Sequence, residues 1–560
     1  MEKKPELLCP VGGQDTLQAA LRGGADAVYF GATEFNARMN AKNFDRAALS
    51  EAVLRCHEKG VKVYVTLNTL LTDRQIPRAM ELVSFLYNAG ADALILADRG
   101  LSTLIHVSFP DLELHASTQV SGHNVSAAVS LAQAGFSRMV CARELDQKNL
   151  KLLCADSPLE IELFVHGAIC ASHSGQCLMS SMIGDRSGNR GECAQPCRLP
   201  YNGAYPLSFK DLSLACHVKE ILSLGVSSLK IEGRMKGPSY VYTAASIWRT
   251  LLDEGRDATP KEMAQLAGAF SRSGFTDGYF TRKLKSDMLG VRTSRDKEIT
   301  EKTSVSFRDM KRCAPPITFN RKPQEIAEPV LPKKEKTSFG RSARFLRPEQ
   351  IPETDLFREI YLPLDVFDGT RANGVILPSV VMDSERDRVR FSLEKAVKAG
   401  ARHVLVGNIG HLDLAKDLPV TLHGDFRLNV TNSFSLSSYP SLEDVIVSPE
   451  LNLAQLRDLR GKKSVIVYGR LPLMLLEKQV GTKCLRDRRG IGFPVIREGE
   501  RDVVLNSVPI YMLDREKDLK ERGITMRHYI FTTESPEEVK KILSAIEQKA
   551  PAKGNVRRIK

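Results

Sequence analysis

The chain has 560 residues, 42% hydrophobic and 26% charged, so it is too long for one ordinary core and has the composition of a globular protein of two or three domains. No stretch approaches the roughly 18 consecutive apolar residues of a membrane helix, and the opening MEKKPELLCP lacks the apolar core of a signal peptide, so we expect a cytoplasmic protein without a membrane partner. The net charge of +13 favours a polyanionic partner such as RNA, but scattered lysines on an ordinary basic protein would give the same total.

The first 240 residues alternate between strand and helix patterns. Repeated βα units that end at glycine indicate a parallel sheet with helices outside it. About eight or nine strands before residue 235 predict an N-terminal (β/α) barrel-like domain, with a doubly wound sheet as the alternative. The predicted strands are Glu6–Val11, Ala27–Gly31, Lys62–Asn68, Ala93–Ala97, Glu113–Val120, Arg138–Ala142, Glu160–His166, Tyr205–Leu212 and Ser228–Glu232, and the predicted helices are Gln14–Arg22, Phe44–Lys59, Arg74–Asn88, 99–107, 124–134, 146–154, Tyr240–Leu252 and Lys261–Phe270.

Polar side chains follow several of these strands, where a barrel would carry its active site. Arg38, Asn68 and Gln119 are candidate substrate-binding residues at such strand ends. His115 and His166 are candidate acid–base residues, because imidazole titrates near neutral pH. Any one of these residues alone fits a structural hydrogen bond better, and their shared position is what favours a site.

Four cysteines, Cys170, Cys177, Cys193 and Cys197, leave the end of one predicted strand in a segment rich in glycine and serine. Such backbone can wrap closely around a bulky group, and four thiols suit tetrahedral zinc or an iron–sulfur cluster. Disulfides do not suit a chain without an export signal. The wide spacing of the first pair favours the iron–sulfur cluster, with zinc as the alternative.

Charged residues lie within this segment and after it. Lys230, Glu232 and Arg234 alternate along the last strand of the series and therefore lie on one side of it. They form either an internal ion network or a clamp for a dicarboxylate, in which Glu232 is a candidate catalytic residue. Arg186 and Arg190 lie between the cysteines and would hold an anionic substrate or compensate the charge of thiolate-bound iron.

Several motifs resemble the signature of the peptidase U32 (collagenase-like) family. They are Glu162-x-Phe164-x-His166-Gly167-Ala168-x-Cys170, Gly175-x-Cys177-x-Met179-Ser180, Lys230-Ile231-Glu232-Gly233-Arg234-Met235-Lys236 and Glu6-Leu7-Leu8-x-Pro10-x-Gly12, and the resemblance covers about residues 5–290. The better-understood members of this family look like oxygen-independent hydroxylases that carry a 4Fe–4S cluster on four cysteines. Some of them modify RNA pyrimidines at carbon 5 and require prephenate, and others hydroxylate the ubiquinone ring.

The resemblance implies an iron–sulfur-dependent hydroxylase of a pyrimidine in tRNA or rRNA. Its cluster would be held by the four cysteines, and prephenate, the oxygen donor, would be gripped by Arg234, Lys230 and Arg186. Iron–sulfur assembly proteins would be further partners. The alternatives are a collagenase-like peptidase and a hydroxylase of a small aromatic or quinone substrate. No H-E-x-x-H or G-x-S-x-G motif supports the peptidase.

The second half repeats the first in weaker form. Residues 399–406 echo residues 89–96, Leu422-His423 echoes Leu114-His115, and Val467-Tyr468-Gly469 echoes Val165-His166-Gly167. Because the order of the echoes is preserved, we predict that residues 345–545 form a second, degenerate barrel-like α/β domain. Pro472 stands at the position of Cys170, so this copy should hold no cluster.

These patterns divide the chain at three boundaries. Residues 1–290 are predicted to form the barrel with the cysteines, 291–344 a linker rich in proline and charge, including Pro323, Pro329 and the run 333–336, and 546–560 a basic tail. The arginines of segment 486–490 and the tail make the second half a candidate RNA-facing surface, although a solvated charged surface explains them equally well.

Overall fold

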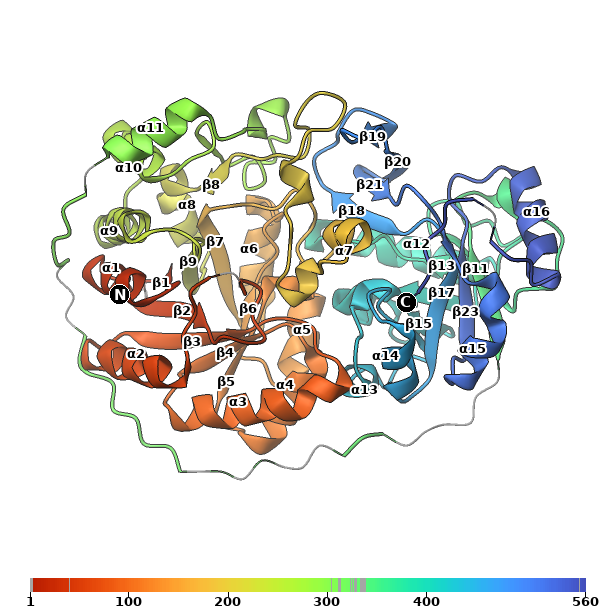
Figure 1. Cartoon of the computed structure of the whole chain (residues 1–560), viewed down its shortest axis with the longest axis horizontal. Helices are drawn as coiled ribbons and strands as arrows, with labels where there is room; N and C mark the ends of the chain where they lie inside the picture. The colour runs from red at the N-terminus through yellow and green to blue at the C-terminus, as the bar shows by residue number, and fades with distance from the viewer. Residues whose placement is uncertain are drawn as a thin grey trace.

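The computed structural model describes residues 4–39, 41–303, 305–310, 314–322, 324, 326, 330–332, 339–552 and 554–559. Two closed barrels lie side by side, the first coloured red to yellow and the second teal to blue (Figure 1). The predicted pair of barrel-like α/β domains is thereby confirmed. None of the described helices is long and apolar enough to cross a membrane.

Eight parallel strands form the first barrel, and the ring closes where the last of them pairs with both its neighbours, β7 and β1. Most of these strands begin or end within one or two residues of the predicted positions. The prediction succeeds because strands and helices alternate and each kind of element has its own apolar period. These strands are β1 (Glu6–Pro10), β2 (Ala27–Gly31), β3 (Lys62–Leu67), β4 (Ala93–Leu96), β5 (Glu113–Ala116), β6 (Arg138–Val140), β7 (Glu160–Gly167) and β9 (Ser228–Ile231).

The predicted strand Tyr205–Leu212 is wrong in extent and in role. Only Asp211–Ser213 (β8) is a strand, and it runs antiparallel to β7 outside the ring, with β10 (Phe275–Thr276) beyond it. β7 is long enough to extend past the ring, so its last residues offer a free edge: His166 pairs with Ser213 and Gly167 with Leu212.

Four of the helices of the first barrel begin where a side chain caps the backbone. Asp45, Asp98, Asn124 and Asp146 each accept a hydrogen bond from an N–H group of the first turn that follows. The helices are α1 (Gln14–Arg22), α2 (Arg46–Glu58), α3 (Ile76–Asn88), α4 (Arg99–Ser108), α5 (Val125–Gln133), α6 (Gln147–Asp156), α7 (Met179–Gly184), α8 (Val218–Ser223), α9 (Pro238–Glu254), α10 (Pro260–Ala269) and α11 (Ser294–Lys302).

The second barrel has the same order of strands around its ring and closes through β17, which pairs with both β16 and β23. Its strands are β11 (Gly340–Arg344), β12 (Glu359–Pro363), β13 (Gly374–Ile376), β14 (His403–Val406), β15 (Thr421–Gly424), β16 (Val445–Ile446), β17 (Lys463–Gly469) and β23 (Met526–Ile530), with β22 (Ile510–Tyr511) antiparallel on β17. Its helices are α12 (Arg386–Lys398), α13 (Ser433–Ser437), α14 (Leu453–Asp458), α15 (Glu516–Glu521) and α16 (Pro536–Glu547).

Between β17 and β23 the second barrel carries an antiparallel sheet that the first lacks. It consists of β18 (Pro472–Leu476), β19 (Cys484–Arg486), β20 (Gly492–Glu498) and β21 (Arg501–Leu505), in the order β18-β21-β20-β19. In Figure 1 this sheet lies beside α7, above the junction of the two barrels.

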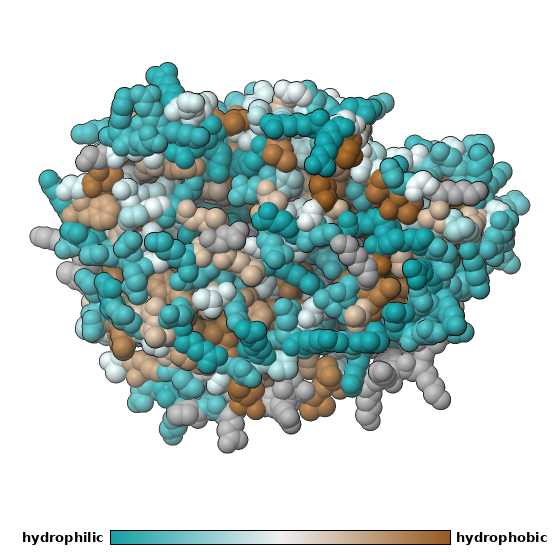
Figure 2. Space-filling view, viewed as in Figure 1, coloured by the Kyte–Doolittle hydropathy of each residue, from teal (hydrophilic) through white to brown (hydrophobic). Residues whose placement is uncertain are grey.

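The predicted linker is partly structured, since α11 lies within it and β11 begins at Gly340, ahead of the expected boundary at 345. Its described residues follow the first barrel: Met310 N–H donates to Arg22 O and Ile317 N–H to His57 O, both over 2.9 Å. Pro323, Pro329 and the charged run 333–336 lie outside the described residues. On the face drawn in Figure 2, polar side chains cover most of the surface and hydrophobic residues form small separate patches.

The barrels meet through contacts that repeat with nearly two-fold symmetry. Asn124, the cap of α5, donates from Nδ2 to Val381 O over 2.8 Å, and Asn432, the cap of α13, donates to Leu71 O over 3.0 Å. A Cβ on Gly100 would lie 2.3 Å from the backbone nitrogen of Ser435, so only glycine permits this approach. The two copies therefore pack like the halves of a symmetric dimer.

Candidate functional site

The carboxyl ends of β2, β3, β7 and β9 bring most of the predicted site residues to one mouth of the first barrel. Arg38 follows β2, Asn68 follows β3, His166 lies at the end of β7, and Glu232 and Arg234 follow β9. Because parallel strands of a barrel all end on the same face, residues separated by up to two hundred positions meet there.

Arg38 and Glu232 form an ion pair at this mouth. Arg38 Nη2 lies 2.6 Å and Nε 3.2 Å from Glu232 Oε1, and the Glu232 side chain is nearly buried. Burial alone would raise the pKa of Glu232, but Arg38 and Arg143 lower it to about 2. Glu232 is therefore an anion at neutral pH, with its second oxygen, Oε2, free of any hydrogen bond among the described residues.

Arg234 is buried beside this pair and held by neutral groups. Its Nη1 donates to Thr66 Oγ1 over 3.1 Å, and its Nη2 donates to the Oδ1 atoms of Asn36 over 3.2 Å and Asn43 over 2.6 Å. Burial lowers the pKa of Arg234 to about 10, so the guanidinium stays charged at neutral pH. A cation without a carboxylate of its own is a natural receptor for an anionic ligand.

Lys230 does not join this mouth. Its Nζ lies 2.6 Å from Glu162 Oε1, and Glu162 is also 3.3 Å from Arg138 Nη1 inside the ring. Both Lys230 and Glu162 are buried, so the internal ion network, rather than the clamp, describes Lys230. Of the two alternating cations, Lys230 and Arg234, only Arg234 is therefore placed to bind a carboxylate ligand.

His115 lies in the same interior layer as this network, away from the strand ends. Its ring packs edge-on against Tyr64 at 4.7 Å, and its Nε2 lies 3.5 Å from Glu113 Oε2. Burial lowers the pKa of His115, so its ring is neutral. His115 therefore does not lie at the mouth as expected, because its side chain is fully buried inside the ring against Tyr64.

His166 lies at the mouth but is not the near-neutral acid–base group that its residue type suggests. Its Nδ1 is 3.3 Å from Ser213 Oγ, and its Nε2 is buried without a partner among the described residues. Burial between Tyr240 and Phe275 lowers the pKa of His166 to about 3. The ring can hold a hydrogen bond to a ligand as a neutral imidazole.

The four cysteines surround one region beyond the end of β7. Cys170 and Cys193 are exposed, Cys177 and Cys197 are partly buried, and all four are free thiols. Burial is the main cause that raises the pKa of Cys177, and the other three thiols raise it further. Burial likewise raises the pKa of Cys197 to about 12, with contributions from Cys170 and Cys193.

The spacing of these thiols tests which metal group they fit. A tetrahedral zinc ion with Zn–S bonds of about 2.3 Å places its sulfur ligands about 3.8 Å apart. Among the described residues, no three of the cysteine sulfurs lie within 4.8 Å of one another. The sulfurs therefore lie farther apart than the ligands of one tetrahedral zinc ion.

Arginines lie close to several of the thiols. Arg143 Nη1 lies 3.6 Å from Cys170 Sγ, and its guanidinium stacks on Phe164 at 4.3 Å. Burial raises the pKa of Cys193, and Arg38 and Arg186 partly offset it. The sequence prediction missed Arg143, although it follows β6 at the same face and could have been found by that position.

Arg186 and Arg190 have different surroundings. Arg186 is exposed and donates from Nε to Glu192 O over 3.2 Å. Arg190 is mostly buried, with Nε and Nη2 unpaired among the described residues, and burial lowers its pKa against the opposing effect of Glu450 of the second barrel. Arg186 therefore belongs to the thiol region, whereas Arg190 faces the junction of the barrels.

Asn68 and Gln119 complete the predicted set. Asn68 Oδ1 accepts a hydrogen bond from Ala37 N over 3.0 Å and so fixes the loop that carries Arg38. Gln119 lines a pocket between the barrels together with Arg427 and Asn429. Asn68 thus supports the mouth, while Gln119 lies at the junction.

Several polar atoms at this face are buried and unpaired among the described residues. They include acceptors and donors on opposite sides of the mouth: Glu232 Oε2, His166 Nε2, Arg234 Nε, Arg143 Nε and Asp211 Oδ2. Leaving such atoms without a partner costs about 1–3 kcal/mol each. Atoms of this kind are the ones that a bound polar ligand or water would satisfy.

The second barrel supports the thiol segment directly. His173 N–H donates to Leu475 O and Leu178 N–H to Leu473 O, both over 2.8 Å, so the segment between Cys170 and α7 pairs with β18. Asn202, just after the last cysteine, binds Arg486 of strand β19 through backbone and side chain. The thiol segment is thereby held between both halves of the chain.

The fold and the site define a (β/α)₈-barrel protein with a thiol-rich mouth. The family model described as peptidase family U32 matches residues 12–289. The chain is 34% identical over 310 residues to a collagenase of Porphyromonas gingivalis and covers 73% of that protein. The chain belongs to the peptidase U32 family, which confirms the resemblance seen in its motifs.

Two other relatives carry names that refer to RNA. The chain is 39% identical over 286 residues to the "23S rRNA 5-hydroxycytidine C2501 synthase" of Escherichia coli, a match that spans 49% of this chain and 42% of the relative. It is 35% identical over 268 residues to "tRNA hydroxylation protein P1" of Bacillus subtilis, spanning 45% of this chain and 64% of the relative. The matched parts are therefore less than two thirds of either relative.

Proposed function

We propose that this chain is a hydroxylase that adds one oxygen atom to carbon 5 of a pyrimidine in transfer or ribosomal RNA. The names of the two RNA-related relatives support this reaction, and both matches cover the barrel that carries the thiols. The observation that carries the proposal is the group of four free thiols at the mouth of that barrel, beside buried unpaired polar atoms.

Cys170, Cys177, Cys193 and Cys197 would hold a 4Fe–4S cluster, with zinc as the alternative. Such a cluster, when bound, supplies one-electron chemistry at the mouth. Arg143 and Arg38 would balance its negative charge, since both lie close enough to affect the thiols. The same cations keep Glu232 ionised, so the mouth holds fixed charges of both signs.

Prephenate would bind beside the thiols as the oxygen donor. It is a dicarboxylate, and Arg234 is a buried guanidinium that has neither a carboxylate partner nor a bond at Nε within the described part of the chain. Lys236, which follows on the same segment, has a pKa lowered to about 7 by burial and adds a second cation. His166 Nε2 and Glu232 Oε2 would accept hydrogen bonds from a hydroxyl or water at the same place.

The RNA would approach over the hairpin of β19 and β20. Arg486, Arg488 and Arg489 are exposed on this hairpin, which is docked next to the last cysteine through Asn202. Exposed arginines provide phosphate contacts, and an enzyme that modifies a base must receive it outside its stack. The tail contributes less, because Arg557 and Arg558 pair with Asp185 and Asp514, and Lys553 and Lys560 lie outside the described residues.

A peptidase is the second candidate, since one relative is named collagenase. Ser213 and His166 lie 3.3 Å apart, the arrangement of a nucleophile and a base. However, burial lowers the pKa of His166 to about 3, and its Nε2 has no carboxylate to orient it among the described residues. The pair lacks the features that activate a serine, so the geometry favours the hydroxylase.

The test is mass spectrometry of RNA from cells that lack this gene. One pyrimidine in a transfer or ribosomal RNA should lose the mass of one oxygen atom, and the wild-type gene should restore it. Cys170→Ala should fail to restore it, whereas Cys484→Ala, a matched change in the second half, should succeed. An unchanged RNA profile, together with cleavage of gelatin by pure protein that lacks iron, would establish the peptidase instead.

A further inference from the structure

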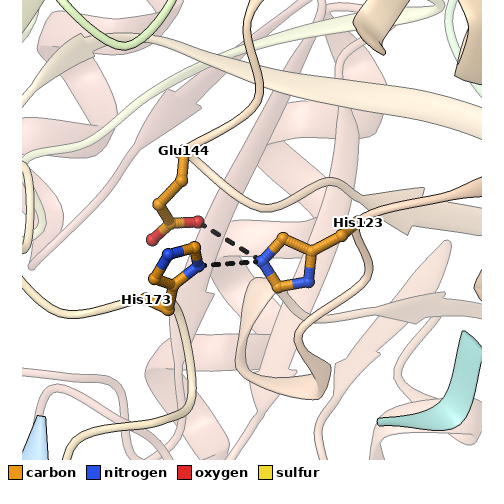
Figure 3. A group of neighbouring side chains, drawn as sticks. All are labelled: His123, Glu144 and His173. Carbon is orange, nitrogen blue, oxygen red and sulfur yellow. Dashed lines mark hydrogen bonds and ion pairs between the residues drawn. The ribbon is translucent and has the colours of Figure 1, made fainter. Parts of the chain in front are cut away.

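Three buried side chains form a cluster next to the thiol segment. His123 follows β5, Glu144 follows β6, and His173 follows β7, and all three are at most 1% exposed. Figure 3 shows the two imidazole rings facing each other with the carboxylate beside them. His123 Nε2 lies 3.2 Å from His173 Nδ1 and 3.8 Å from Glu144 Oε2.

The outer nitrogens of both rings determine which atoms carry protons. His123 Nδ1 lies 2.6 Å from Ser121 O, and a carbonyl oxygen only accepts, so this nitrogen carries the hydrogen. His173 Nε2 lies 2.9 Å from Glu477 Oε2, and it carries the hydrogen for the same reason. If both rings are neutral, each of the two nitrogens that face each other therefore carries a lone pair and no hydrogen.

Two lone pairs that face each other repel unless something positive lies between them. Glu144 Oε1 accepts hydrogen bonds from Ser174 N over 2.8 Å and Ser174 Oγ over 3.1 Å. This pair of bonds fixes the carboxylate and leaves Oε2 toward His123.

We propose that His123, Glu144 and His173 bind a divalent transition metal ion, zinc or ferrous iron, at a site separate from the four cysteines. Two nitrogen ligands at about 2.0–2.1 Å from a tetrahedral ion lie about 3.3 Å apart. The 3.2 Å between His123 Nε2 and His173 Nδ1 matches this edge. Two histidines and one carboxylate are a donor set that both ions use.

The surroundings have the features that accompany metal-bound histidine. Such a ring commonly donates its other N–H to a carbonyl or a carboxylate, as His123 does to Ser121 O and His173 does to Glu477. Glu477 is itself held by Arg501 Nε at 2.7 Å. Three loops and the second barrel therefore converge on this position.

Full burial indicates a structural role for the ion. His173 lies between Cys170 and Cys177, so a metal at this site would fix that segment against the loops that follow β5 and β6. Through Glu477 it would also couple the thiol segment to β18 of the second barrel. This inference does not depend on the reaction proposed above.

The experiment is metal and sulfide analysis of the full chain purified without oxygen, with zinc and then ferrous iron added back. Wild-type protein should contain about one metal ion beyond those accounted for by labile sulfide. His173→Gln and His123→Gln should lose that ion and keep the sulfide. His411→Gln is the matched control, since His411 is another fully buried histidine at the junction of the barrels and should leave both unchanged.

Glu144→Gln and cobalt substitution guard against misfolding of the histidine variants. Glutamine can still accept the hydrogen bonds from Ser174 but should bind the metal ion more weakly. Cobalt in the wild-type site should give visible ligand-field bands without a thiolate charge-transfer band. The proposal is overturned if wild-type protein binds no ion beyond the sulfide-linked iron. It is also overturned if His403→Gln, in the facing histidine pair of the second barrel, removes the extra ion while His173→Gln retains it.

Discussion

The two barrels place their longest insertion at the same point, between the seventh and eighth strands of each ring. In the first barrel the insertion between β7 and β9 holds four cysteines with little regular structure around them. In the second, the insertion between β17 and β23 folds into the four-stranded antiparallel sheet. One copy therefore carries an irregular segment with the cysteines, and the other carries at the same point a regular sheet that pairs with that segment.

The two insertions support each other through backbone pairing between the thiol segment and β18. His173 N–H donates to Leu475 O, so the thiol segment gains a backbone partner from the second copy where it would otherwise have none. Pro472, at the position of Cys170, begins β18 and offers no thiol. The second copy is therefore degenerate in its chemistry and retained for its packing.

Loss of one thiol should have the largest effect, because the four cysteines are the chemical difference between the two barrels. Cys177→Ala should remove most of the iron, expected at about four per chain, together with the labile sulfide and all hydroxylation. Cys484→Ala, in β19 of the second copy, should change none of these. Iron and sulfide analysis with RNA mass spectrometry is the measurement, and stoichiometric zinc without sulfide in wild-type protein would contradict it.

The next largest effect concerns buried arginines in the two barrels. Charge-assisted hydrogen bonds contribute about 1.5–3 kcal/mol, so Arg234→Ala should lower kcat/KM for the anionic donor roughly 10- to 100-fold. Arg344 lies 3.2 Å from Asp425 within the second barrel, and breaking a buried pair costs about 3–5 kcal/mol. Arg344→Ala should therefore lower the free energy of unfolding but leave kcat/KM of the folded protein unchanged.

Steady-state kinetics and denaturant titrations of both variants separate these outcomes. An Arg234→Ala protein with wild-type kcat/KM would show that this guanidinium only supports the fold. An Arg344→Ala protein with reduced kcat/KM at full folding would show that the second barrel takes part in the reaction.

Asn124 and Asn432, the equivalent helix caps at the junction, should have a smaller effect on the free energy of unfolding. Asn124→Ala and Asn432→Ala should each reduce the free energy of unfolding by about 1–2 kcal/mol, because each removes a helix cap and a hydrogen bond to the other barrel. Asn452→Ala is the control, since Asn452 caps the exposed start of α14 without any bond to the first barrel. Its effect should be smaller, and equal losses in all three variants would mean that the junction bonds contribute nothing.

The smallest expected effect is a pH dependence specific to the first mouth. Burial lowers the pKa of Lys236 to about 7, so its positive charge is lost as the pH rises through 7. KM for an anionic donor should rise a few-fold between pH 6 and 8, and Lys236→Arg should remove that rise. A KM profile that is identical in the variant would contradict a role for this cation.

The lowered pKa of Lys236 also makes the free energy of unfolding depend on pH, and here a higher pH is favourable. Because the pKa of Lys236 in the folded chain lies below its unfolded value of 10.5, the unfolded state binds more protons between these two pKa values. The contribution of Lys236 to the free energy of unfolding therefore decreases as the pH falls from 10.5 to 7 and is constant below 7. Calorimetry of wild-type protein and Lys236→Met over that range measures the difference.

The sequence by itself determined the positions of most strands and helices of the first barrel. Their apolar periods and their capping residues, such as Asn124 and Asp146, are local features that survive in any tertiary context. It also determined the grouping of the four cysteines, since a short glycine-rich segment keeps neighbours in sequence close in space. The echoes in the second half predicted its fold for the same reason, because equivalent periods build equivalent elements.

Only the tertiary structure decided which charges pair and which histidines titrate. Arg38 meets Glu232 and Lys230 meets Glu162 because barrel closure sets which strand ends are neighbours. Burial, which depends on packing from distant segments, keeps His166 neutral and places His115 inside the ring. His123, Glu144 and His173 belong to three loops with no common motif, and they meet because three consecutive parallel strands end on the same face.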